Sequence, residues 1–145
     1  MILTETKIPE SVYYRNCQGC NFVCSKATVT VYGGAQGGDG IILRDKPEGC
    51  IVESTRVHRL NVMSCEITSG NQKTPLIGAY LPPSTLDHLS DLEEVLNCFQ
   101  IREPFILGDL NADIGCLRNP RDQKVADLLA SFGMVDLLAH FQNHF

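Results

Sequence analysis

The sequence predicts an α+β protein in which two β-sheets pack face to face as a sandwich, with helices on the outside. In the first half, short apolar segments separated by Gly, Pro, Asn and Asp indicate strands joined by turns. In the second half, apolar residues that recur every three or four positions alternate with short apolar strands. No linker or repeat interrupts the pattern, so we expect a single domain over residues 1–145.

The predicted strands follow the apolar segments in chain order. The chain begins with a short strand at residues 2–3, followed by a strand pair within 20–32 and a flexible Gly-rich turn at 33–40. After a second turn at 45–49, the pattern continues to the loop Gly108-Asp109-Leu110-Asn111. The remaining strands are expected at 41–43, 50–55, 60–67, 75–81 and 104–107.

Two helices follow from periodicity and capping residues. Leucines and other apolar residues at three- and four-residue steps predict a helix over 86–99, with Ser84 or Thr85 as its cap. A second helix is predicted to begin at Asn119, with Pro120 in the first helical position, and to end at Gly133. A last short helix is expected to start near Val135.

Charge and apolar content limit the function classes. The net charge of −5 argues against a protein that holds nucleic acid by bulk positive charge. It does not argue against a nuclease, because a Mg²⁺ site needs carboxylates and the ion then meets the phosphate. The sequence shows no secretion signal and no run of eighteen apolar residues. We expect an intracellular protein, with the nucleus as one candidate compartment and no membrane partner.

The cysteines leave two interpretations open. Seven cysteines without a secretion signal indicate reduced thiols. The spacing of Cys17, Cys20 and Cys24 would suit zinc, but a structural site usually has four ligands and no second pair of ligands follows. The alternative is that these cysteines are small apolar residues around a strand, and the sequence does not determine their role.

The segment with the clearest chemistry is residues 104–113, where an apolar strand leads into Gly108-Asp109-Leu110-Asn111. Polar side chains at the end of a rigid strand can share a cleft. In phosphodiester hydrolysis, a carboxylate there would activate water, and an amide would stabilise the charged phosphorane-like oxygens. The alternative is a turn whose Asp and Asn only satisfy backbone groups.

Two further segments, Leu3-Thr4-Glu5-Thr6-Lys7 and Gly78-Ala79-Tyr80-Leu81-Pro82-Pro83-Ser84, precede it. In this order the three segments resemble the endonuclease/exonuclease/phosphatase family, most closely the endonuclease domains of non-LTR retroelement reverse transcriptases. The resemblance implies a phosphodiesterase that uses Mg²⁺ or Mn²⁺ on nucleic acid, with DNA favoured over RNA or small phosphoesters.

The resemblance also implies roles at the matching positions. Glu5 would bind the metal, Tyr80 would hydrogen-bond a phosphate oxygen, Asp109 would activate the water, and Asn111 would stabilise the transition state. The alternatives are a surface Glu5 beside Lys7, a sheet-edge Tyr80 and a structural loop.

The sequence also departs from the family. Members have an additional first strand that carries a metal-binding Asn, and final strands that carry a Ser/Thr-Asp-His segment. Neither occurs in this chain, and neither His140 nor His144 follows a Ser-Asp pair. We therefore expect a truncated domain with little or no nuclease activity, and the competing interpretation is a non-catalytic remnant or binding module.

Near the Asp109 loop, the sequence has three basic residues, Arg118, Arg121 and Lys124. They are either contacts to the nucleic-acid backbone or solvated charges.

Overall fold

A computed structural model of the chain describes residues 1–135 except 4–5, 9–11, 18–19, 30, 32, 39, 45–49, 60, 84–85 and 100–101. The structure divides into two compact units, Met1–Asp109 and Leu110–Phe145, which are described in turn. The single domain expected over residues 1–145 stays a prediction. Neither helix in the described part has the length and apolar content needed to cross a membrane.

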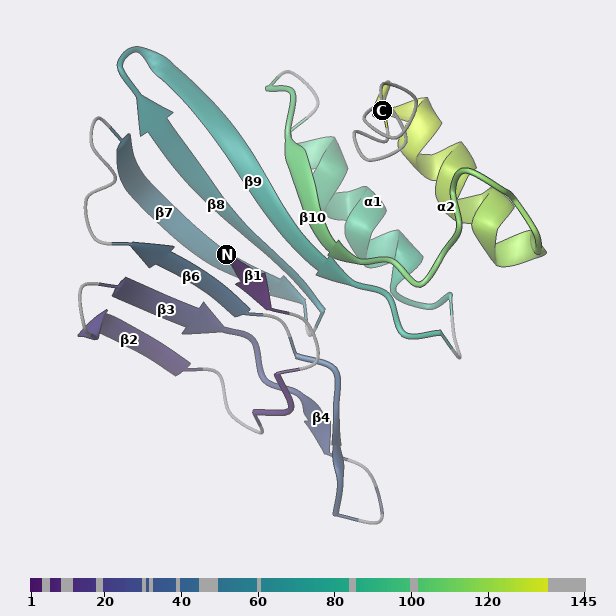
Figure 1. Ribbon diagram of the computed structural model, residues 1–145, viewed down its shortest axis with the longest axis horizontal. Coiled ribbons are helices and arrows are strands. Elements are labelled where there is room, and N and C mark those ends of the chain that lie inside the picture. The colour runs from purple at the N-terminus through teal and green to yellow at the C-terminus, as the bar shows by residue number, and fades with distance from the viewer. Residues whose placement is uncertain are drawn as a thin grey trace, which may run out of the picture. The chain divides into compact units, whose positions relative to one another are not determined.

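The first unit contains a four-stranded antiparallel sheet (Figure 1). Its strands, in spatial order, are β1 (Ile2–Leu3), β6 (Gly40–Arg44), β3 (Cys20–Cys24) and β2 (Val12–Cys17). Strand β2 was not predicted, because its Arg and Asn interrupt the apolar pattern and only its pairing with β3 defines it. A further two-stranded sheet pairs β4 (Thr28–Val29) with β5 (Ala35–Gln36). The prediction of a flexible turn throughout 33–40 is therefore wrong at β5.

The second four-stranded sheet of this unit is mixed. In spatial order it contains β10 (Phe105–Asp109), β9 (Gln72–Tyr80), β8 (Val62–Ser69) and β7 (Cys50–Arg59). Strands β7, β8 and β9 are antiparallel neighbours, whereas β10 runs parallel to β9. Together with the two helices, this mixed sheet confirms the predicted α+β class.

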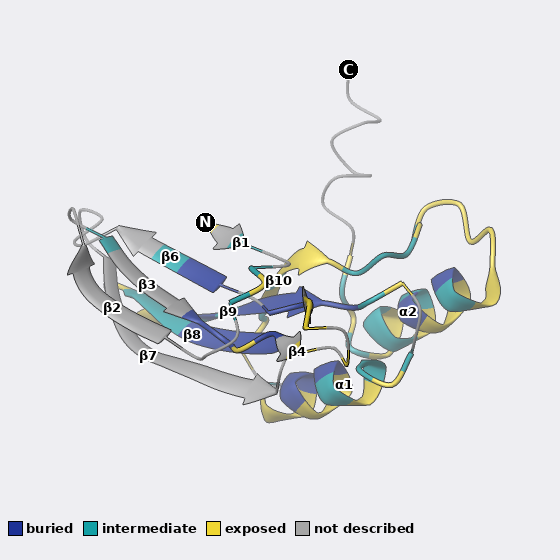
Figure 2. Ribbon diagram, turned by 90° about the horizontal axis from the view of Figure 1, so that it is seen from below, coloured by how far each residue is buried: buried dark blue, intermediate teal, exposed yellow. Residues whose placement is uncertain are grey.

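Strand β8 lies at the centre of the core. On one face, Met63 and Cys65 pack with Ile41 of β6. Because side chains alternate along a strand, Val62 and Ser64 project to the opposite face. Helix α1 (Leu89–Cys98) lies against β7 and β8, with three residues fully or almost fully buried: Leu92, Val95 and Leu96 (Figure 2). Burial on both faces explains why residues 62–65 are all buried without alternating polarity.

Helix α1 confirms the predicted helix over 86–99, although it begins later than expected. The backbone N–H of Leu89 donates to the carbonyl of Leu86 (2.9 Å), so the first predicted residues form a turn. His88 is the N-cap, and its side chain makes no capping hydrogen bond. The predicted caps, Ser84 and Thr85, lie outside the described residues.

The second unit contains helix α2 (Pro120–Ser131), and its boundaries follow the predicted signals. Asn119 is the N-cap, Pro120 follows it, and Gly133 has the positive φ of 68° typical of a helix end. The Asn119 side chain accepts hydrogen bonds from the N–H groups of Arg121 (2.9 Å) and Asp122 (3.0 Å). The short helix expected near Val135 falls largely on residues outside the description.

Gly108 permits the close approach of β10 to β9. The sequence predicted a loop from Gly108, but β10 continues through Asp109, and the N–H of Leu81 donates to the Asp109 carbonyl (2.9 Å). Gly108 has a φ of 150°, and a Cβ placed on it would lie 1.9 Å from the carbonyl oxygen of Ala79. Only glycine fits at this position without movement of the backbone.

We therefore expect Gly108→Ala to lower the free energy of unfolding by about 2 kcal/mol or more, through steric overlap and backbone strain. Gly115→Ala is the matched control, because its Cβ would lie 3.8 Å from the nearest atom, Asp113 Oδ1. Its effect should stay within about 0.5 kcal/mol. Urea unfolding of the three proteins measures both effects, and equal stability of the two variants would contradict the steric argument.

Candidate active site

The parallel pair β9–β10 brings two of the predicted site residues together. Asp109 is the last residue of β10 and pairs in register with Tyr80, the last residue of β9. Register partners lie about 5 Å apart and project to the same face of a sheet. Tyr80 and Asp109 therefore stand side by side where the two strands end, on the face that also carries Leu76 of the core.

These two residues differ sharply in exposure. Asp109 is exposed, as is most of β10, which forms one edge of its sheet (Figure 2). Tyr80 is only 5% exposed, and its backbone N–H donates to the carbonyl of Asn61 (2.9 Å). The site thus offers an accessible carboxylate beside a buried ring, which leaves little of Tyr80 for contact with a phosphate.

Glu5, the predicted metal ligand, lies outside the described residues, but the residues around it are described. On one side, Leu3 pairs with Gly40, and its strand β1 lies against β10. On the other side, the N–H of Thr6 donates to the carbonyl of Gly38 (2.9 Å). The described residues on either side of the Glu5 position, Leu3 and Thr6, therefore pair with Gly40 and Gly38.

This Gly-rich segment also reaches the strand end that carries Tyr80. The N–H of Gly38 lies 3.4 Å from Oδ1 of Asn61, which is buried. A Cβ on Gly37, where φ is 74°, would lie 2.6 Å from the same Oδ1 and 3.8 Å from Cδ1 of Tyr80. Asn61 and these two glycines border the strand end of Tyr80, which sequence reasoning missed because their contacts join segments distant in the sequence.

Asn111, the third predicted catalytic residue, belongs to the second unit and follows Asp109 by two positions in the chain. Its φ of 47° is unusual for a residue with a side chain, although Asn adopts it more readily than most. The Asn111 carbonyl accepts a hydrogen bond from Nε of Arg121 (2.8 Å). The amide that would stabilise a transition state thus stands on a backbone fixed by α2.

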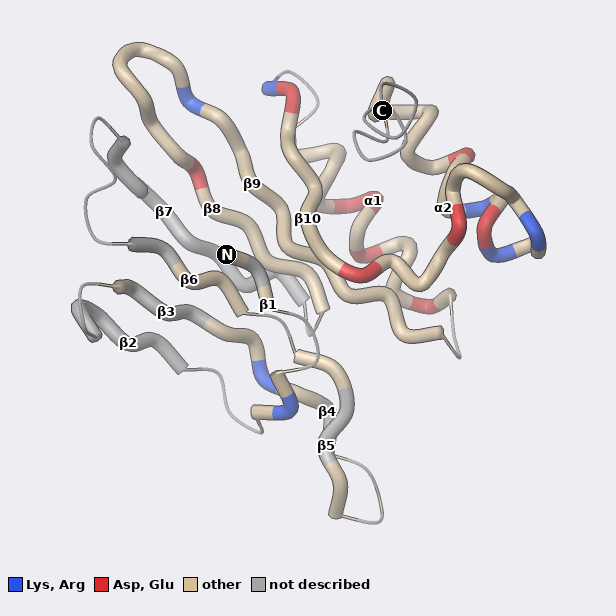
Figure 3. The backbone as a smooth tube through the Cα atoms, viewed as in Figure 1, with Lys and Arg blue, Asp and Glu red and all other residues tan. Residues whose placement is uncertain are grey.

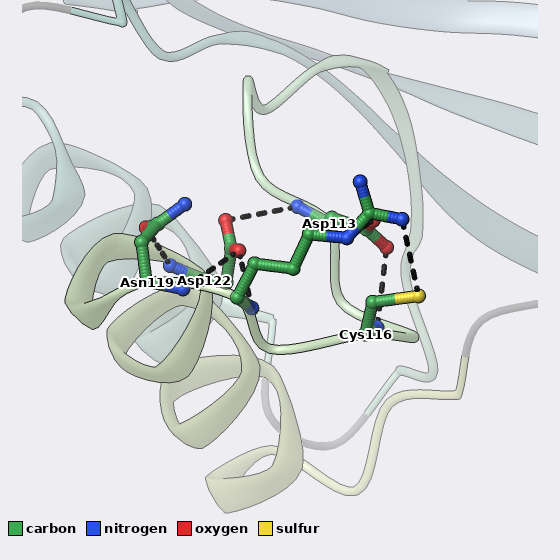
Figure 4. Close-up of polar contacts among 5 residues, drawn as sticks. Asp113, Cys116, Asn119 and Asp122 are labelled. Carbon is green, nitrogen blue, oxygen red and sulfur yellow. Dashed lines mark hydrogen bonds and ion pairs between the residues drawn. The ribbon is translucent and has the colours of Figure 1, made fainter.

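Asp122 organises the rest of this loop (Figure 4). Its carboxylate is 2% exposed and accepts hydrogen bonds from three backbone N–H groups. The donors are Asp113 (3.0 Å), Arg118 (2.9 Å) and Asn119 (3.2 Å). Burial alone raises the pKa of the Asp122 carboxyl, but these hydrogen bonds outweigh burial, and the pKa is lowered from its usual value. The spacing of Asn119 and Asp122 is a capping-box signal that was available in the sequence.

The three basic residues near this loop have different surroundings. The Arg121 guanidinium is turned onto loop carbonyls, whereas the side chain of Arg118 is 73% exposed and lies 3.5 Å from Asp113. Lys124 is exposed. Basic and acidic residues are interspersed along 110–131 (Figure 3). This unit therefore does not present a strong patch of one sign within its described residues.

Comparisons with known proteins identify the fold. No family model and no curated protein matches the chain. Among solved structures, the endonuclease domain of TRAS1, a telomere-specific non-LTR retrotransposon, is similar at a TM-score of 0.57 and 16% identity, over 79% of this chain and 54% of that chain. An endonuclease/exonuclease/phosphatase family protein from Leptotrichia buccalis C-1013-b matches at a TM-score of 0.50 and 18% identity, over 88% of this chain and 47% of that chain.

The chain has the endonuclease/exonuclease/phosphatase fold. The resemblance that the three sequence segments indicated is thus confirmed for the fold, and it includes a retrotransposon endonuclease domain as the sequence suggested. The chain spans about half the length of these two structures.

The resemblance found in the sequence implies a divalent metal ion, and the oxygen donors that it assigns suit one. Mg²⁺ prefers oxygen ligands and keeps several waters, so one or two carboxylates suffice. The resemblance assigns the metal-binding carboxylate to Glu5, and Asp109 is a further exposed carboxylate at the end of β10. The described residues contain no group of three or more His, Cys, Asp or Glu that would hold an ion by protein ligands alone.

The cysteines of β3 do not form the zinc site considered from the sequence. Cys20 and Cys24 are four residues apart on one continuous strand, which separates their Cα atoms by about 13 Å. That distance is too long for two ligands of one zinc ion, whose Zn–S bonds are about 2.3 Å. Cys24 is fully buried, and burial raises the pKa of another core thiol, Cys65, to about 11. Five cysteines are described as free thiols: Cys20, Cys24, Cys65, Cys98 and Cys116.

The lowered pKa of Asp122 predicts acid sensitivity of its loop. The stabilisation is complete above the pKa of a free Asp, about 3.9, and is lost as pH falls through the lower pKa of the folded chain. Hydrogen exchange between pH 6 and 2 should show that the amides of Arg118 and Asn119 lose protection at the acid end. In Asp122→Asn these amides should be poorly protected throughout, whereas Asp127→Asn should behave as wild type. If the protection of these amides in the wild type did not change with pH, the carboxylate of Asp122 would not be what holds the loop.

Proposed function

We propose that this chain is a metal-dependent phosphodiesterase domain that acts on nucleic acid, with DNA as its substrate. One observation carries the proposal: Tyr80 and Asp109 end two parallel strands in register, and the strand that leads to Glu5 lies against β10. Tyr80 and Asp109 come from segments distant in the sequence, and the contact of β1 with β10 supports a position of Glu5 near them. The fold shared with an endonuclease domain supports nucleic acid as the substrate.

The proposed roles follow from the chemistry of each group. Asp109 is exposed and would orient the attacking water and accept its proton. Asn111 would donate its side-chain amide to the phosphoryl oxygens as charge develops in the transition state. Glu5 would hold Mg²⁺ or Mn²⁺, which when bound supplies positive charge to the phosphate. The buried Tyr80 would support the site by packing, and only its small exposed part would contact a phosphate oxygen.

We also propose that the two four-stranded sheets form the sandwich of this fold. The packing of Ile41 from one sheet with Met63 and Cys65 from the other supports this arrangement. Cleavage of DNA is in keeping with the intracellular, nuclear location considered from the sequence. In this acidic chain, a bound metal ion would supply positive charge at the phosphate.

The second candidate function is a non-catalytic binding module. It is favoured by the edge strand β10, where Phe105 is 50% exposed and Leu107 is 48% exposed. Exposed apolar residues on an edge strand suit a protein contact rather than a hydrolytic site. Catalysis would depend on Asp109, whereas this contact would depend on Phe105 and Leu107, so variants separate the two functions.

We expect the purified chain to nick supercoiled plasmid slowly in the presence of Mg²⁺, and chelation of the metal should stop the reaction. Asp109→Asn should lower the rate at least about 100-fold, because it removes the proton acceptor while keeping the size of the side chain. Agarose-gel quantification of nicked plasmid measures the rate.

Asp127→Asn is the control, because it removes one exposed carboxylate from α2. It should retain the wild-type rate. If wild type and Asp109→Asn show the same Mg²⁺-dependent nicking, the activity does not arise at this site. If no protein nicks plasmid, the hydrolase proposal fails for this chain and the binding module is favoured.

A further inference from the structure

We infer that Arg121 is a positioning residue for Asn111 and not a contact to the nucleic-acid backbone; the inference rests on the proposed function of Asn111. The guanidinium donates from Nε to the carbonyl of Asn111 (2.8 Å) and from Nη2 to the carbonyl of Leu110 (3.1 Å). Two adjacent carbonyls of the loop are thus held by one planar group. A planar guanidinium with donors in a fixed geometry suits this task, whereas a lysine ammonium does not reproduce it.

The base of the Arg121 side chain is itself fixed by the start of α2. Its backbone N–H donates to the Asn119 side chain (2.9 Å), as part of a capping box with Asp122. Arg121 and Asp122 are neighbours in the first helical turn, and one binds hydrogen-bond acceptors of the loop while the other binds donors. Arg121 binds carbonyls at the beginning of the loop, and Asp122 binds N–H groups further along it. One helix turn therefore holds the loop along its length.

This arrangement matters because Asn111 has an unusual backbone conformation, with a φ of 47°. A residue in this region persists where surrounding contacts hold it. The carbonyl that Arg121 holds belongs to Asn111 itself, so the contact constrains the peptide plane next to the Asn111 Cα. An error of about 1 Å in a catalytic group can lower a rate about 100-fold. Arg121 would therefore affect catalysis through the orientation of the Asn111 side-chain amide.

The geometry argues against a direct phosphate contact by Arg121. Its side chain is partly buried and directed at the carbonyls, whereas the Arg118 side chain is 73% exposed. A phosphate that paired with the Nε and Nη2 edge of the guanidinium would displace the hydrogen bonds that this edge donates to the two carbonyls. Loss of such a charge-assisted hydrogen bond is costly when the acceptor is left partly buried.

The experiment compares Arg121→Gln and Arg121→Lys with a control, Lys73→Gln, which removes an exposed positive charge from β9. The first measurement is ¹H–¹⁵N NMR of the backbone and side-chain amides of Asn111. We expect both Asn111 signals to shift in Arg121→Gln and to shift less in Arg121→Lys. In Lys73→Gln they should coincide with those of the wild type. Unchanged Asn111 signals in a folded Arg121→Gln protein would overturn the inference.

The second measurement is plasmid nicking with kcat and KM determined separately. We expect Arg121→Gln to lower kcat about 10- to 100-fold with KM for DNA within about twofold, because the change acts on the transition state. In an Asn111→Ala background, Arg121→Gln should have no further effect, since both changes remove the same group. A raised KM with unchanged kcat would instead indicate that Arg121 contacts the nucleic-acid backbone. In that case the slope of log affinity against log salt concentration should also fall by about one.

The two proposals fail in different ways. If the wild type does not nick DNA, the proposed function fails, while the NMR comparison still decides whether Arg121 positions Asn111. If Arg121→Gln does not fold, Arg121→Lys is judged by the same signals and rates. Its smaller predicted shift of Asn111 supports the inference, and wild-type signals contradict it.

Discussion

The parallel pairing of β10 with β9 is the constraint on which the candidate site depends. Because the pairing runs in register to the last residue of each strand, an exposed carboxylate stands beside a buried aromatic ring. Gly108 makes this possible, since any other side chain at that point would meet the carbonyl of Ala79. The backbone pairing of two strands therefore positions the polar residues of the site.

A second set of contacts joins the N-terminal segment to the same region. Backbone hydrogen bonds tie Thr6 and Lys7 to Gly38 and Gly37, and Asn61 lies between these glycines and the strand end of Tyr80. The two glycines adopt positive φ and leave no room for a side chain. A buried polar group lowers the stability of the fold strongly when its hydrogen bond is broken and little when the bond is made. These contacts therefore favour one arrangement of the segments.

Two charged residues of the second unit, Arg121 and Asp122, hold its own backbone. Asp122 binds three N–H groups, and Arg121 binds two carbonyls, so neither charge is simply available to a ligand. This explains why a count of basic residues near the Asp109 loop is a poor guide to a nucleic-acid contact. In a chain with a net charge of −5, the proposed metal ion, held by carboxylate, would supply the positive charge that attracts a phosphate.

Local physical chemistry let the sequence alone determine the α+β class, the main strands of the mixed sheet, and α2 with its Asn119 cap. Periodicity and capping act within a few residues, so they can be read without the fold. The sequence did not predict β2, the β4–β5 pair, the late start of α1 or the continuation of β10 through Asp109. Those features depend on pairing and packing between distant segments. The motif residues of the site could be identified in the sequence. Only the tertiary structure places Tyr80 beside Asp109 and directs the Arg121 guanidinium to the loop carbonyls. The physical reason is that strand register and hydrogen-bond partners depend on contacts between strands and loops.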